Sequence, residues 1–129
     1  MARILVIDDD KAIRNLIHTF LTKKGHEVFL AGDGETGLSM FNRVRPMITI
    51  LDLRMPGLDG LEVLRRLRAI DSRSIVIMLT GYGPDEVKAK AMALGANEFL
   101  KKDFTAYELG EVLRRTIDRL MRIPPGTAA

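Results

Sequence analysis

The sequence predicts an α/β domain in which helices cover both faces of a parallel sheet. Five short apolar runs alternate with segments whose apolar residues recur at helical spacing. These runs are continuous rather than alternating with polar residues, as in strands that are covered on both faces. At 129 residues, the chain is expected to form one domain with its own hydrophobic core.

The first half of the chain is predicted to contain three strands, at residues 4–7, 28–31 and 47–51. Between the first two strands we predict a helix, whose buried face is formed by Ile13, Leu16, Ile17, Phe20 and Leu21. Gly25 lies where this helix should end. A second helix carries Leu38 and Phe41 and is terminated by Pro46.

The second half is predicted to contain two more strands, at residues 75–79 and 98–101. A turn at residues 55–60 leads into a helix before the fourth strand, and another helix, ending near Gly95, follows the loop at 81–84. Residues 105–108 have the pattern of a capping box, which begins the last helix. The final residues, 124–129, read as a linker or a disordered terminus.

Composition excludes several classes of site. The chain has no cysteine, so disulfides, thiolate zinc sites and cysteine nucleophiles are ruled out. Its net charge is only +3, and its arginines are expected on solvated helix faces, so we expect no direct nucleic acid binding. The sequence also lacks apolar runs of about 20 residues and the features of a signal peptide, and we therefore expect a cytoplasmic protein that does not enter membranes.

Charged and hydroxyl side chains follow four of the five predicted strands: Asp8, Asp9 and Asp10, then Asp52, Thr80 and Lys102. Each has an ordinary alternative role, since an aspartate can cap a helix, a threonine can lie in a strand and a lysine can lie at the surface. However, the carboxyl ends of parallel strands meet at one edge of a sheet, where ligands bind in such folds. Their coincidence at this edge favours a functional site.

These residue types favour metal-dependent phosphoryl chemistry. Clustered carboxylates repel one another unless a cation joins them, and oxygen ligands suit Mg²⁺. The metal can neutralise a phosphoryl group, and a carboxylate can be the nucleophile that accepts it. Lys102 and the Thr80 hydroxyl would then bind phosphoryl oxygens, with room left by Gly81. The sequence thus predicts an aspartate that accepts phosphate.

Four sequence blocks, at residues 7–10, 50–60, 79–81 and 95–102, resemble the motifs of receiver domains of two-component response regulators, in particular chemotaxis-regulator-like ones. The resemblance covers residues 3–121. It implies a flavodoxin-like (βα)5 doubly wound fold, with five parallel strands in the order 2-1-3-4-5. It also divides the chain into a receiver domain at 1–121 and a tail or the start of a linker at 122–129.

Carried over by position, the resemblance makes Asp52 the phosphoacceptor. Asp9 would be a direct ligand of Mg²⁺ (or Mn²⁺), Asp8 a ligand directly or through water, and the backbone carbonyl of Arg54 a further protein ligand. Counted from the fourth block, the lysine of the family falls on Lys102. Asp10 takes a variable position, where capping of the helix is expected.

The resemblance also implies a switch in which Thr80 moves toward the phosphoryl group and Phe99 changes its rotamer, although Phe99 could also be an ordinary half-buried strand aromatic. The phosphoryl donor would be a sensor histidine kinase or a phosphotransfer protein. Output would pass through the fourth helix, fifth strand and fifth helix to a partner or to an effector domain absent here, and a homodimer is compatible with this. Such a protein is no enzyme beyond its own phosphorylation and dephosphorylation.

Two features concern details of the site. The family usually places a proline after its lysine, in a cis peptide, whereas Asp103 follows Lys102 here, so the sequence leaves the state of that bond open. Arg54 and Tyr82 occupy the positions that tune the lifetime of the phosphoryl group. Both are large, and we predict slow self-dephosphorylation.

Two other functions are compatible with parts of the sequence. A haloacid-dehalogenase-like phosphohydrolase would use Asp8 as nucleophile and Asp10 as acid and base, but it leaves Asp52 without a role, and Ala12 departs from its motif. A flavin-binding module shares the predicted topology, which by itself does not establish function. The carboxylates at the intended phosphate site argue against it.

Overall fold

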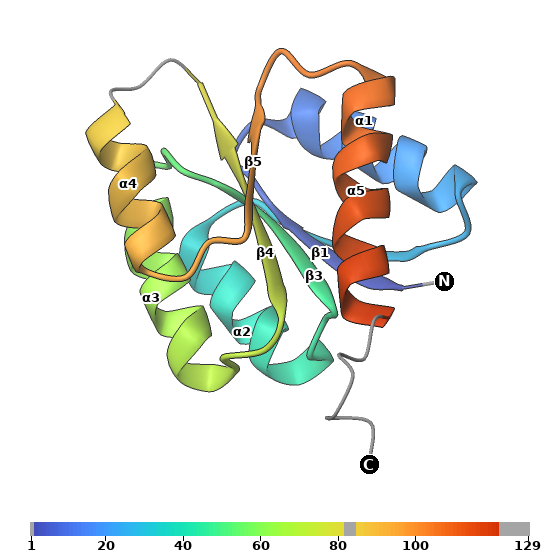
Figure 1. The fold of residues 1–129 in the computed structure, drawn as a ribbon. Helices are drawn as coiled ribbons and strands as arrows, with labels where there is room; N and C mark the ends of the chain where they lie inside the picture. Colours follow the sequence, from blue (N-terminus) through green and yellow to red (C-terminus); the bar gives the residue numbers. More distant parts are fainter. Residues whose placement is uncertain (1, 82–84, 122–129) are drawn as a thin grey trace, which may run out of the picture.

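Five parallel strands form one sheet in the order β2-β1-β3-β4-β5 in the computed structural model of the chain, which describes residues 2–81 and 85–121 (Figure 1). The predicted strand order is confirmed. The strands are β1 (Arg3–Ile7), β2 (Glu27–Ala31), β3 (Ile48–Asp52), β4 (Ile75–Thr80) and β5 (Glu98–Lys101). The helices are α1 (Lys11–Lys23), α2 (Gly34–Val44), α3 (Gly60–Ile70), α4 (Asp85–Ala93) and α5 (Ala106–Met121).

The helices cover both faces of the sheet, with α1 and α5 on one side and α2, α3 and α4 on the other (Figure 1). Successive side chains of a strand point to opposite faces, so the continuous apolar strands supply both cores. In β1, for example, Ile4 and Val6 pack toward α1 and α5, whereas Leu5 and Ile7 pack toward α2 and α3. The two cores leave the ends of the strands as the place for polar side chains.

Aspartate side chains and a capping box fix where four of the helices begin. Asp10, Asp33 and Asp59 accept hydrogen bonds from backbone N–H groups in the first turns of α1, α2 and α3. At α5, the Glu108 N–H donates to the Thr105 hydroxyl and the Thr105 N–H donates to the Glu108 carboxylate, so the predicted capping box is confirmed. Asp10 therefore has the capping role expected for it.

Leu16 departs from the prediction for the first helix. Its side chain is 55% exposed, whereas Ile17 and Leu21 are fully buried and Ile13 and Phe20 are half-buried. These four side chains already cover the face of α1 that packs on the sheet, and Leu16 lies at the margin of that stripe. The helical spacing of Leu16 is compatible with burial, but it does not determine how wide the contact between α1 and the sheet is.

Gly60 joins α3 directly to the end of β3. Its N–H donates to the Leu53 carbonyl at 3.1 Å, and a β-carbon at this position would overlap the Asp52 backbone oxygen and lie 2.7 Å from the Leu53 Cα. Only glycine lets the backbone of α3 approach so closely. This contact fixes the segment that carries Asp52.

The helices within the described residues are too short or too polar to span a membrane.

We expect Gly60→Ala to lower the free energy of unfolding by about 2 kcal/mol or more, because a backbone contact cannot move aside as a flexible side chain can. Urea denaturation followed by circular dichroism measures this. Gly81→Ala is the matched control, since a β-carbon at Gly81 meets no atom within 4 Å. Equal stability of the two variants would contradict the role assigned to Gly60.

Candidate functional site

The predicted strand-end residues meet at the carboxyl edge of the sheet. Asp8 directly follows β1, Asp52 is the last residue of β3, and Lys102 directly follows β5. The strands end level with one another, because Ile7 pairs with Leu51 and Thr80 pairs with Lys101 in the parallel register. The parallel strands thus bring these side chains together at one edge of the sheet.

The site is a cluster of three carboxylates. Asp8, Asp9 and Asp52 each offer an oxygen, and these three oxygens all lie within 4.8 Å of one another. Asp8 and Asp52 are buried, with 0% and 1% of their surface exposed, whereas Asp9 is exposed. The cluster is therefore closed on the protein side and open to solvent through Asp9.

Lys102 bridges the two buried carboxylates. Its Nζ donates to Oδ2 of Asp52 at 2.9 Å and to Oδ1 of Asp8 at 3.3 Å. The peptide bond between Lys102 and Asp103 is trans, as are all those of the described residues, so the family's cis geometry is not needed for this contact. Asp103 itself is exposed.

The electrostatics of the cluster raise the pKa of Asp52 to about 7. Burial is the main cause, and the neighbouring charge of Asp8 adds to it, against the hydrogen bond from Lys102 and the backbone N–H of Arg54. Burial alone would lower the pKa of Lys102, but its hydrogen bond to Asp52 and the charges of Asp52 and Asp8 raise it. Lys102 thus stays protonated while Asp52 titrates near neutrality.

One buried carboxylate oxygen of Asp8 has no hydrogen-bond partner among the described residues. Oδ1 of Asp8 accepts from the Asp10 N–H at 2.8 Å and from Lys102, while Oδ2 is buried and accepts no hydrogen bond from the described residues. A buried oxygen without a partner is costly, and three carboxylates against one ammonium leave the cluster negative. The donor set fits a hard divalent cation such as Mg²⁺.

The remaining predicted residues lie around this cluster. Thr80 is half-buried at the end of β4, and its carbonyl accepts from the Lys102 N–H at 2.8 Å. Phe99 is half-buried in β5, on the side of the sheet that α4 covers. The Nζ of Lys88 lies 5.0 Å from the centre of the Phe99 ring, a cation–π contact that the sequence did not indicate. Tyr82 lies outside the described residues.

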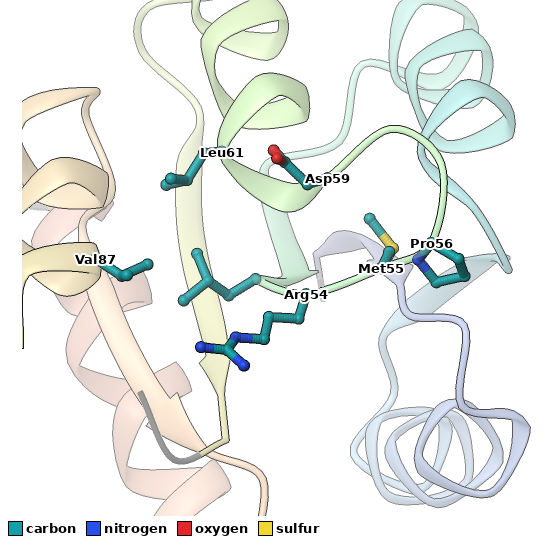
Figure 2. A pocket seen from close by; sticks show the side chains of 7 residues that line it. Arg54, Met55, Pro56, Asp59, Leu61 and Val87 are labelled. Atoms are coloured by element: carbon teal, nitrogen blue, oxygen red, sulfur yellow. The ribbon is translucent and has the colours of Figure 1, made fainter. Parts of the chain in front are cut away.

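Arg54 belongs both to the cluster and to a pocket beside it. Its backbone N–H donates to Oδ1 of Asp52 at 3.2 Å, while its exposed side chain lines a pocket of about 440 Å³. In Figure 2, Leu61 of α3 and Val87 of α4 project toward the same pocket. The side chain of Arg54 therefore lies in solvent beside the pocket, while its backbone contacts Asp52.

Residues 4–114 match the family described as response regulator receiver domain. Over 113 residues the chain is 33% identical to sporulation initiation phosphotransferase F of Bacillus subtilis, covering 88% of this chain and 91% of that protein. It is 39% identical over 127 residues to the response regulator MprA of Mycobacterium leprae, covering 98% of this chain. It spans only 54% of MprA and 25% of the regulatory protein AtoC of Escherichia coli.

Solved structures agree with this result. The receiver domain protein of Clostridium thermocellum is 36% identical, with a TM-score of 0.87 over 93% of this chain and 97% of that one. The CheY-like receiver domain protein of Methanospirillum hungatei is 27% identical, with a TM-score of 0.89 over 92% of this chain and 95% of that one.

We expect Asp52→Asn to stabilise the metal-free protein above neutral pH by roughly 4 kcal/mol, because the buried carboxyl no longer has to ionise. The pKa of Asp52 is about 7 in the folded protein and lower in the unfolded chain. The folded state therefore binds more protons than the unfolded state from about pH 4 to 7. Wild-type stability should therefore fall through this window relative to the variant. Urea titrations at pH 5 and 8 test this, with Asp103→Asn, at an exposed carboxylate, as control. If the free energies of unfolding of wild type and Asp52→Asn differed by the same amount at both pH values, this expectation would be wrong.

Proposed function

The chain belongs to the response regulator receiver domain family, and from this we propose that it is a phosphorylation-controlled switch with Asp52 as its phosphoacceptor. The observation that supports this most is the bridge from Lys102 to Asp52 and Asp8 beside the orphaned oxygen of Asp8. It combines a nucleophilic carboxylate, a cation-binding cluster and a fixed positive charge. A sensor histidine kinase or a phosphotransfer protein is the proposed donor.

In the proposed reaction, an oxygen of Asp52 forms a bond to phosphorus while the bond from phosphorus to the donor nitrogen breaks. Lys102 is already at Oδ2 of Asp52, so a small shift of its ammonium brings it to a phosphoryl oxygen. Asp8, Asp9, Asp52 and the backbone carbonyl of Arg54 would hold Mg²⁺ or Mn²⁺. The cation, when bound, neutralises charge on the phosphoryl oxygens.

The proposed switch runs from Thr80 to Phe99. The Thr80 hydroxyl binds a phosphoryl oxygen, and the space that it leaves at the end of β4 admits a new rotamer of Phe99. To move the ratio of active to inactive conformation from 1:99 to 99:1, the phosphoryl group must bind the active conformation more favourably by about 5.5 kcal/mol. The output surface is that of α4, β5 and α5. On this surface Lys88 covers Phe99.

We further propose that residues 1–121 form the receiver domain and that 122–129 are a tail or the start of a linker. Output passes to a partner or to an effector domain beyond this sequence. The longer regulators, of which this chain spans a part, support the second arrangement. The protein works in the cytoplasm and catalyses only its own phosphorylation and dephosphorylation.

Labelling with radioactive acetyl phosphate and Mg²⁺ tests the phosphoacceptor. Asp52→Asn should abolish the label, and Asp8→Asn should reduce it, because the cation loses a ligand. Asp103→Asn should leave it unchanged. Label that persists in Asp52→Asn but disappears in Asp8→Asn would overturn the receiver reaction in favour of a phosphohydrolase that uses Asp8 as nucleophile.

The lifetime of the phosphoryl group is predicted to depend on Arg54 and Tyr82, whose size shields the acyl phosphate from water. The double variant Arg54→Ala with Tyr82→Ala should lose its label severalfold faster than wild type after acetyl phosphate is removed. Decay is followed by retention of radioactivity on the protein. An unchanged half-life in the double variant would contradict this shielding.

A further inference from the structure

We infer that Arg14 of α1 is a positioning residue, which holds the peptide between Asp8 and Asp9 so that both carboxylates face the cation site. This inference rests on the proposed function and assigns a further residue to the same site. It is supported by a contact of the Arg14 side chain, by the space left for it at the end of β2, and by the position of the held peptide.

Arg14 binds the peptide that joins the two aspartates: its Nη1 donates a hydrogen bond to the Asp8 carbonyl oxygen at 2.6 Å. Arg14 is half-buried and lies at the end of the first turn of α1, six residues further along the chain than Asp8. That carbonyl belongs to the peptide that links Asp8 to Asp9, so its orientation sets the direction in which each side chain leaves the backbone. Asp8 points into the protein and Asp9 lies exposed at its opening.

The other bonds of Asp8 leave this carbonyl to Arg14. The Asp8 N–H donates to the Ala31 carbonyl at 3.1 Å, and Oδ1 of its side chain accepts from Asp10 and Lys102. These contacts fix where β1 ends and where the carboxylate of Asp8 lies. The Asp10 contact closes a turn around the Asp8–Asp9 peptide but leaves its carbonyl oxygen without a donor. Arg14 donates to that oxygen and so adds a constraint on the peptide itself.

The end of β2 provides the room for Arg14. A β-carbon at Gly32, the residue after β2, would lie 3.1 Å from Nη1 of Arg14 and 3.5 Å from its Cζ. Such a contact is tight enough to displace the guanidinium by a few tenths of an ångström. β2, the edge strand beside β1, ends without a site side chain. Its end instead leaves space for the Arg14 guanidinium, which contacts the carbonyl at the end of β1.

The sign of the effect separates positioning from simple electrostatics. The guanidinium of Arg14 carries a positive charge, so by charge alone Arg14 repels a divalent cation at the cluster. If its charge were its main influence, removing it would tighten metal binding. If it positions the Asp8–Asp9 peptide, removing it weakens metal binding, as loss of groups that orient metal ligands does.

The test measures Mn²⁺ affinity of the full chain by electron paramagnetic resonance, without phosphorylation. Arg14→Met should raise the Kd by about tenfold or more, the usual cost of losing an orienting partner of a metal ligand. Gly32→Ala should raise it less, and it should add nothing in the Arg14→Met background, because both changes act on one contact. Arg43→Met, at an exposed arginine of α2, is the control and should bind like wild type.

Thermal melts without metal establish that the variants are folded. If Arg14→Met does not fold, Gly32→Ala and Arg14→Lys carry the test, and an unchanged Kd in both overturns the inference. An unchanged or lower Kd in folded Arg14→Met overturns it as well, while wild type still binds Mn²⁺. Absence of Mn²⁺ binding by wild type would instead remove the proposed metal site itself, so the two failures are distinguishable.

Discussion

Two buried carboxylates side by side are the constraint around which this domain is organised. Asp8 and Asp52 have almost no exposed surface, and burial together with the charge of Asp8 raises the pKa of Asp52. The ammonium of Lys102 holds both, but one positive charge does not balance three carboxylates. The site is therefore less stable than a neutral one, and the proposed cation would relieve this imbalance.

The fold supplies the rigidity that keeps these charges together. Asp8, Asp52 and Lys102 lie at the ends of three different strands, and each strand is packed on both faces. The close approach of Gly60 to the backbone of Asp52 and Leu53 ties the end of β3 to α3. Because these strands cannot move apart easily, the two carboxylates stay buried side by side. Burial, with the charge of Asp8 adding to it, raises the pKa of Asp52.

Much of the fold, and the placement of Asp8, Asp52, Thr80 and Lys102 at one edge of the sheet, could be predicted because they depend on local patterns. The strand at 98–101 and the capping box at Thr105 and Glu108 were predicted correctly from a few adjacent residues. The exposure of Leu16 could not be predicted in this way, because it depends on how closely α1 lies against the sheet. The same is true of Lys88 over Phe99, where the two residues come from α4 and β5.

The sequence by itself determined the order of the elements, the parallel sheet and the aspartates, threonine and lysine at its carboxyl edge, since hydrophobic period and strand ends are properties of neighbouring residues. Only the tertiary structure decided which atoms meet: that Lys102 reaches both Asp8 and Asp52 through a trans peptide, that one oxygen of Asp8 is left without a partner, and that Arg14 holds the Asp8 carbonyl. These contacts join residues from different elements, and hydrogen bonds and pKa values depend on distances of a few ångströms that no local pattern encodes.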